Sequence, residues 1–265
     1  MFIKIDFSKK GDEKWQVIVT NKAYLVLKHR LKLTIFDRLL RVLSKLFAFE
    51  LYAYQHRYIR NQILKRTDGV LHIGGSFGQE AGEYDDYDLK VIWIEGLPEV
   101  FLDLEQNISK YPSQRAFNAL LGANSGSTKF ILTSNGFMSS SLYRLNRVVA
   151  AQYDYEELGS IELNLVRLDE VFPPDVLVGM SHWVIDVQGA ELEVLKGSGA
   201  LLQLCNTLEV ECSNYEVYKL APLLQNIEEF LNEAGFIKLL AVPSRFHGDV
   251  IFVRSRKAFE SDSLI

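Results

Sequence analysis

The stretch VLHIGGSFGQE, residues 70–80, decides the fold, because it describes a buried strand that runs into a glycine-rich turn. The apolar run ends at Gly74, Gly75 and Gly78, and polar residues follow. Glycines here let the backbone turn tightly and approach a phosphate group or a neighbouring element closely. The stretch also fits a turn needed only for packing a helix on a strand, so by itself it assigns no ligand.

The segments that follow alternate between strands and helices, which is typical of an α/β fold. We expect strands at 70–75, 90–96, 115–122, within 160–171, 181–189 and 205–213, with an antiparallel edge formed by 237–243 and 248–254. We expect helices over 97–111, from 190 and over 221–236, and a hairpin or loop insertion over 124–145. This order predicts a Rossmann-like, doubly wound, mostly parallel sheet whose loops after residues 75, 95, 120 and 186 meet around one crevice.

The composition is that of an ordinary globular protein. The chain has 265 residues, of which 48% are hydrophobic and 24% charged, enough for one domain with an appendage. No run of about 18 uncharged apolar residues exists, and charges interrupt the N-terminus, so we expect neither a transmembrane helix nor a secretory signal. Cys205 and Cys212 form no CxxC pattern and indicate reduced thiols in a cytoplasmic protein.

The charge is divided unevenly along the chain. Residues 1–67 contain 15 Lys or Arg and 5 Asp or Glu, whereas the whole chain has a formal net charge of −5. This segment predicts two short strands, at 2–7 and 15–20, and a basic amphipathic helical region over 24–65. The basic face, with Arg38, Arg41 and Lys45, either contacts a membrane surface or a protein partner, or is the solvated face of a packed helix. We expect no nucleic-acid partner.

The second strand ends in Glu95, about 20 residues beyond the glycine turn. An acid at this position accepts hydrogen bonds from both ribose hydroxyls of an adenosine. The alternative is an exposed charge at a strand end. The spacing therefore favours a nucleoside-binding role for Glu95.

The stretch WVIDVQGAELEVLKG, residues 183–197, contains the strongest catalytic candidate. Asp186 is a carboxylate inside an apolar strand, which is costly unless the group is paired or functional. Gly189 permits a turn, and Glu191 then opens a helix whose dipole favours negative charge. Asp186 is therefore either a buried, hydrogen-bonded structural acid or a functional residue, and its place at the carboxyl end of the strand favours function. Glu191 is either functional as well or a helix cap.

The first glycine motif departs from two common nucleotide loops. Its pattern G-G-S-F-G lacks the G-x-G-x-x-G of dinucleotide-binding proteins and the Lys-Ser/Thr of P-loops. It fits the D/E-x-G-x-G-x-G motif of S-adenosylmethionine-dependent methyltransferases, with His72 at the acid position and Ser76 in place of the middle glycine. We expect His72 to pack and hydrogen-bond within the sheet.

Six segments, in order, resemble the FkbM-type methyltransferase family over roughly residues 68–254. They are VLHIGGSFGQE, VIWIEGLPEVFLDLEQNI, FNALLGANSGSTKFILTSNGFMSSSL, VRLDEV, DVQGAELEVLKG and LEVECSNYEVY. The resemblance implies a class I methyltransferase domain over 68–255, between an appendage of residues 1–67 and a tail of residues 256–265. It further implies S-adenosyl-L-methionine as cofactor and O-methylation of a glycan, sugar or secondary metabolite.

The resemblance also implies the site residues. Those expected to bind the cofactor are Gly74, Gly75, Gly78, Glu80, Glu95, Asn118, Ala119, Ser140 and Ser141. Asp186 is the expected base, with Glu191 second and Glu211 in support, while His182 and His247 are weaker candidates. A divalent ion could bridge Asp186 and Glu211, but no ligand spacing requires one, and no metal is expected.

The sequence departs from the family pattern, and His72 together with Ser76 keeps other functions open, whereas the changed turn after the second strand affects only the shape of a loop. His72 replaces the usual acid, and Gly96-Leu97-Pro98 replaces a Glu-Pro-x-Pro-like turn. The alternatives are a nicotinamide-dependent oxidoreductase on the same fold and a non-catalytic scaffold that retains it. For the enzyme we expect a cytoplasmic location, with a peripheral position at the inner face of the membrane if the basic helix binds lipid.

Overall fold

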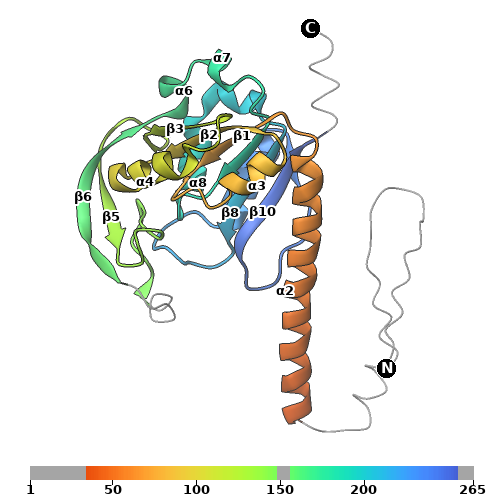
Figure 1. Ribbon diagram of the computed structural model, residues 1–265. Coiled ribbons are helices and arrows are strands. Elements are labelled where there is room, and N and C mark those ends of the chain that lie inside the picture. The colour runs from red at the N-terminus through yellow and green to blue at the C-terminus, as the bar shows by residue number, and fades with distance from the viewer. Residues whose placement is uncertain (1–33, 148–155, 256–265) are drawn as a thin grey trace. The chain divides into compact units, whose positions relative to one another are not determined.

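The computed structural model describes residues 34–147 and 156–255 (Figure 1). The chain divides into two compact units, Met1–Ala48 and Phe49–Ile265. The expected strands at 2–7 and 15–20 lie outside the described residues. The first residues of the expected helical region also lie outside the described residues. Helix α2 (Thr34–Leu64) covers the rest of that region, but the side chains of its basic face lie outside the described part of the structure. None of the helices in the described ranges is long and apolar enough to cross a bilayer.

A seven-stranded sheet forms the centre of the second unit, in the order β3-β2-β1-β7-β8-β10-β9. Five strands are parallel, namely β1 (Gly69–Ile73), β2 (Lys90–Glu95), β3 (Gln114–Asn118), β7 (His182–Ile185) and β8 (Thr207–Ser213). Strand β10 (His247–Arg254) pairs antiparallel with β8 and with β9 (Phe236–Lys238). The expected doubly wound sheet with an antiparallel edge is therefore confirmed, although β9 is shorter than the expected strand over 237–243.

Both faces of this sheet are covered by helices, because its strands alternate apolar side chains between the two faces. In β1, Leu71 and Ile73 point into a core shared with α6 (Leu168–Val171), α7 (Pro174–Leu177), α8 (Glu191–Gly197), the 3₁₀ helix Gly199–Leu204 and α9 (Leu224–Glu233). Val70 points into a second core with α3 (Ala81–Asp86), α4 (Pro98–Ile108) and Leu64 at the end of α2.

A second sheet contains β4 (Leu120–Leu121), β6 (Glu157–Val166) and β5 (Gly126–Thr133), in that order (Figure 1). The single strand expected at 115–122 is wrong, because this segment is divided between the two sheets. The Asn118 side-chain amide donates to the carbonyl of Glu95 at 2.8 Å, and the Ala119 N–H donates to the same carbonyl at 3.0 Å. The pairing of β3 with β2 ends at Asn118, and Leu120 then pairs with Leu165 of β6.

The ends of β1 and β7 meet at the point where the strand order reverses. The Asp186 N–H donates to the Ile73 carbonyl at 2.9 Å, and Gly74 follows with φ +88°. A Cβ atom at Gly74 would lie 1.7 Å from the Asp186 carbonyl oxygen. Only glycine fits this position, since both the backbone angle and the space exclude a side chain.

His72 lies within the sheet, as expected. It is buried, it stacks on Trp93 with ring centroids 4.5 Å apart, and its Nδ1 lies 3.0 Å from the Tyr84 hydroxyl. Burial lowers its pKa to about 3, so the ring is neutral at physiological pH. His72 therefore contributes packing and one hydrogen bond, not charge.

A buried carboxylate on β8 anchors the second half of α2. Glu209 is 5% exposed and pairs with Arg60, whose Nε lies 3.0 Å from Oε2. The Nε2 atoms of His56 and His182 lie 3.5 and 3.6 Å from the same carboxylate. Burial opposes ionisation of Glu209, but the attraction of the Arg60 guanidinium and the two nearby imidazoles outweighs it and lowers the pKa of Glu209 to about 2.

Substitution of Gly74 should destabilise the fold more than the same change at a matched glycine. Gly179 has the same φ of +88°, but nothing lies within 4 Å of a Cβ atom placed there. Gly179→Ala introduces only backbone strain, roughly 1 kcal/mol. Gly74→Ala adds the collision with Asp186, so we expect the loss in unfolding free energy to exceed that of Gly179→Ala by at least about 2 kcal/mol. Denaturant unfolding measures the unfolding free energy of both variants. Equal losses in the two would contradict a steric requirement for glycine at position 74.

The Glu209 anchor predicts a pH dependence of stability. Because its pKa falls from 4.5 to about 2 on folding, the carboxylate contributes stability above pH 4.5 that is lost as the pH falls toward 2. The contribution amounts to about 3 kcal/mol. Glu209→Gln should therefore be much less stable than the wild type at pH 6 and approach it near pH 2. Thermal unfolding across this range tests the expectation, with Glu105→Gln on the exposed side of α4 as control. A constant gap between Glu209→Gln and the wild type would contradict it.

Candidate active site

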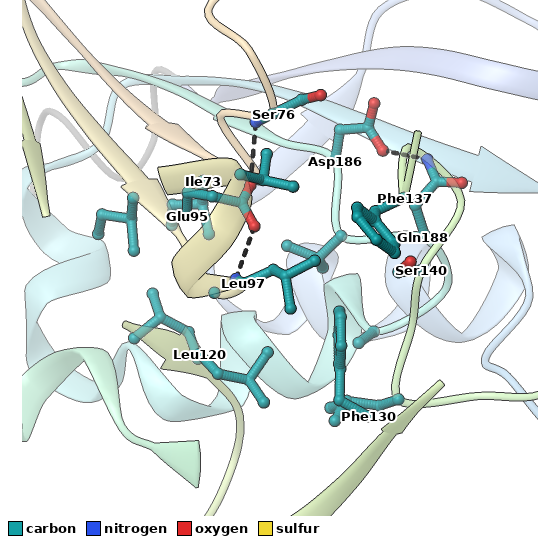
Figure 2. Close-up of a pocket in the computed structure, with 18 of the residues that line it drawn as sticks. Ile73, Ser76, Glu95, Leu97, Leu120, Phe130, Phe137, Ser140, Asp186 and Gln188 are labelled. Carbon is teal, nitrogen blue, oxygen red and sulfur yellow. Dashed lines mark hydrogen bonds between the residues drawn. The ribbon is translucent and has the colours of Figure 1, made fainter. Parts of the chain in front are cut away.

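A crevice opens at the carboxyl ends of β1, β2 and β7, as the strand order predicts. The loops after residues 75, 95, 120 and 186 meet there, which confirms the expectation. Its first part, here called the apolar pocket, is lined mainly by Ile73, Ile94, Leu97, Val100, Leu120, Phe130, Phe137 and Leu142, with Glu95 as an acid among them. Figure 2 shows Glu95 on one side of this pocket, with Asp186 and Gln188 on the other.

A second part, here called the polar pocket, continues from the first. The two share Gly74, Ser76, Met138, Asp186 and Gln188. The polar pocket adds His72, Gly75, Gln79, Glu80, Asn135, Ser139, Glu211, Val217, Tyr218 and His247. Asp186 and Gln188 therefore lie where an apolar compartment meets a polar one.

Glu95 is the last residue of β2, and backbone N–H groups hold its carboxylate in place. Ser76 N–H donates to Oε2 at 2.9 Å and Leu97 N–H donates to Oε1 at 2.8 Å (Figure 2). Burial raises the pKa of Glu95, and these donors oppose the rise. Each oxygen still has a lone pair free for a further donor, so the carboxylate can bind two hydroxyl groups.

Ser76 is strained and carries a buried polar atom. Its φ is +44°, which is unusual for a residue other than glycine. Within the described part of the chain, its Oγ is buried without a hydrogen-bond partner. A strained turn with an unsatisfied hydroxyl beside a pocket is a feature of ligand-binding loops, since a bound polar group supplies the missing partner.

Asp186 lies at the carboxyl end of β7, as expected, but directly after the strand and not inside it, because β7 ends at Ile185. It is half-buried, and the Gln188 side-chain amide donates to its Oδ1 at 2.6 Å. The same amide nitrogen donates to Oε2 of Glu211 at 3.0 Å. Burial raises the pKa of both carboxyl groups, and Glu211 is raised further by the charge of Asp186. The positive φ of Gln188, +56°, and of Gly189, +100°, turns the chain away from the sheet.

Glu191 supports the loop that carries Asp186. It is the first residue of α8 and is 3% exposed. Its Oε1 accepts hydrogen bonds from the backbone N–H groups of Val187 at 3.2 Å and Gly189 at 2.9 Å. Burial raises its pKa to about 8. It lines a neighbouring cavity with Glu211 and His247, so a direct catalytic role for Glu191 stays a prediction.

The carboxylate oxygens of Asp186, Glu191 and Glu211 lie within 4.8 Å of one another. Such oxygen donors suit Mg²⁺ or Ca²⁺. Here each carboxyl group already accepts hydrogen bonds from the chain, and the charges are reduced by raised pKa values. We assign no metal, and its expected absence stays a prediction.

The remaining expected residues divide into two groups. Gly74, Gly75 and Glu80 line the polar pocket, and Ala119 and Ser140 line the apolar one. Outside both pockets are Gly78, Asn118 and Ser141. A Cβ at Gly78 would meet Leu104 and Ile108, and the hydroxyl of Ser141 donates to the Gln188 carbonyl at 2.6 Å.

The two histidines considered from the sequence differ in position. His182 begins β7 at the end away from the crevice and lies beside Glu209. His247 lines the polar pocket, with its Nε2 3.6 Å from Oε1 of Glu211, and burial lowers its pKa. Of the two, only His247 is placed to meet a ligand.

Sequence reasoning missed three residues that shape the site: Ser76, Gln188 and Tyr218. The Tyr218 hydroxyl donates to Oε1 of Gln188 at 2.5 Å. The signal that could have indicated Ser76 was its place in the glycine motif, since that position requires a positive φ. No local signal indicates Tyr218, because its partner lies 30 residues away.

Comparisons with known proteins give solved structures that are similar to this chain only at low sequence identity. No curated protein matches the sequence. Among solved structures, the magnesium protoporphyrin IX methyltransferase from Synechocystis PCC 6803 with bound SAM is 11% identical, covering 89% of this chain and 93% of that one with a TM-score of 0.41. Fibrillarin from Aeropyrum pernix with bound S-adenosyl-L-methionine is 14% identical, covering 72% and 68% with a TM-score of 0.44. These likenesses are weak, and the assignment does not rest on them.

The family match carries the assignment. The model of the methyltransferase FkbM domain matches residues 72–238, which is more than half of the chain. The matched region runs from β1 to β9 and includes the glycine turn, Glu95, Asp186 and Glu211. The resemblance inferred from the sequence is thereby confirmed, and this chain belongs to the FkbM methyltransferase family.

Proposed function

We propose that this protein is an S-adenosylmethionine-dependent methyltransferase that methylates a hydroxyl group of a glycan, a sugar or another secondary metabolite. The observation that carries the proposal is the junction of two pockets at Asp186. One pocket is apolar with a strand-end acid, and the other is polar and lined by carboxyl groups. This arrangement suits a nucleoside cofactor on one side and a hydroxylated acceptor on the other.

The residues of the apolar pocket fit the cofactor. Glu95 has free lone pairs for the two ribose hydroxyls, and the surrounding apolar side chains provide a surface for the adenine. The unsatisfied Oγ of Ser76, at the boundary with the polar pocket, offers a partner for the polar amino-acid end. When bound, S-adenosylmethionine supplies an electrophilic methyl group on its sulfonium.

Asp186 is the proposed base for the acceptor hydroxyl. Its carboxylate lines both pockets, so it can accept a proton from a hydroxyl held against the methyl donor. Burial raises the pKa of Asp186, which makes the carboxylate a stronger base. The walls of the two pockets supply the alignment that an in-line displacement requires.

Two other functions remain as alternatives. A nicotinamide-dependent oxidoreductase would bind NAD, but the turn after β1 lacks the glycine pattern of dinucleotide sites. A non-catalytic scaffold would bind neither cofactor. The polar pocket supports catalysis over a scaffold, because buried carboxyl groups are costly and are retained where they have a function.

Calorimetry distinguishes the three functions. We expect the wild type to bind S-adenosylmethionine and not NAD. Glu95→Ala should weaken S-adenosylmethionine binding by roughly 10- to 100-fold, since it removes hydrogen bonds to a charged acceptor. Glu99→Ala, an exposed acid in the first turn of α4, is the matched control and should bind normally. Binding of NAD alone would establish the oxidoreductase, and binding of neither would establish the scaffold.

Loss of the base should separate chemistry from binding. Asp186→Ala should lower the rate of methyl transfer at least 100-fold, which is the usual contribution of a general base. The dissociation constant for S-adenosylmethionine should change little, and Asp175→Ala in α7 should behave as the wild type. The assay is release of S-adenosylhomocysteine with a saccharide that the wild type methylates. Full activity of Asp186→Ala would remove this residue from the mechanism.

A further inference from the structure

Gln188 lies at the centre of a hydrogen-bond network that joins two acids and a tyrosine. Its side-chain Nε2 donates to Oδ1 of Asp186 at 2.6 Å and to Oε2 of Glu211 at 3.0 Å. Its Oε1 accepts from the Tyr218 hydroxyl at 2.5 Å. If the Gln188 amide were flipped, its oxygen would face the two carboxyl groups, so the network fixes the orientation of this amide.

The backbone of Gln188 is held as firmly as its side chain. Its φ of +56° is unusual for a residue with a side chain. The Ser141 hydroxyl donates to its carbonyl at 2.6 Å, and the following N–H, of Gly189, donates to Glu191 at 2.9 Å. Strain of this kind persists where the surroundings determine it, and here it aims the amide at the acids.

The two acids that the amide joins cannot both be charged without cost. Their oxygens lie within 4.8 Å, where like charges in a partly buried site favour a single shared proton. Other ionisable groups also face the pair, namely Glu80, Glu191, His72, Tyr218, His247 and Asp249. Since the pKa values of His72 and His247 are lowered by burial, neither histidine supplies a counter-charge at neutral pH.

We propose that Gln188 is a positioning residue, which holds Asp186 as the ionised base facing the acceptor and leaves the shared proton on Glu211. The shorter donation, at 2.6 Å, goes to Asp186 and stabilises its negative charge. Glu211 is raised in pKa by burial and, next, by the negative charge of Asp186 beside it, and both favour its neutral form. This assignment rests on the proposed function, because it names the carboxyl group that receives the proton of the acceptor.

The alternative is that Gln188 only cross-links the loop to β8. Both possibilities predict that its loss lowers thermal stability. They differ in titration, since a pure cross-link leaves the ionisation of the acids unchanged, whereas a donor that stabilises the Asp186 anion lowers its pKa. The titration is therefore the measurement that separates them.

The test is a carboxyl ¹³C NMR titration of the full chain labelled at Asp and Glu, without cofactor or acceptor. Signals of the pair are assigned by their absence in Asp186→Asn and Glu211→Gln. Gln188→Met removes both donors at similar length and should raise the pKa of Asp186 by about one unit or more. Gln79→Met, the same change in the same pocket, is the control and should leave it unchanged.

Tyr218→Phe is the second variant, in case Gln188→Met does not fold. It keeps the amide but removes the hydroxyl that orients it, so the pKa of Asp186 should rise by a smaller amount. An unchanged Asp186 titration in the folded variants would overturn the proposal, as would a wild type in which Asp186 keeps the proton to higher pH than Glu211. Because the titration needs no cofactor, its failure is distinguishable from failure of the wild type to bind S-adenosylmethionine.

Discussion

The close approach of Gly74 to the Asp186 carbonyl is the constraint on which the site depends. It brings the ends of β1 and β7 together where the strand order reverses, with no side chain between them. From this junction the glycine turn leads toward Glu95, and the opposite loop carries Asp186 and Gln188. The two pockets meet at this junction because the backbones of Gly74 and Asp186 are in contact there.

Position on one strand does not determine how an acid behaves. Glu209 and Glu211 lie two residues apart on the same face of β8, the first buried and the second half-buried at the edge of the polar pocket. Arg60 pairs with Glu209 and the pKa of Glu209 falls, whereas burial and the neighbouring Asp186 raise the pKa of Glu211. The same sheet face thus holds a structural charge at one end and a proton-carrying group at the other.

Much of the site could be predicted from the sequence because its signals are local. A glycine turn after an apolar strand, an acid at the end of the next strand and a carboxylate within an apolar strand indicated Gly74, Glu95 and Asp186. The division of 115–122 between two sheets could not be predicted, because it depends on the pairing of Leu120 with Leu165, which lies far along the chain. The role of Gln188 depends likewise on Tyr218 and Glu211, which are separated from it by loops and strands.

The division of that segment has a thermodynamic consequence for the apolar pocket. One wall, with Ile94 and Glu95, belongs to the central sheet, and the other, with Leu120 and Phe130, belongs to the second sheet. A molecule in this pocket touches both walls, so its binding free energy adds to the free energy that holds the two sheets together. Separation of the β5–β6 ribbon from the central sheet and release of the bound molecule are then linked equilibria. Stronger contacts between the two sheets would therefore slow the release of the molecule, even where those contacts do not touch it.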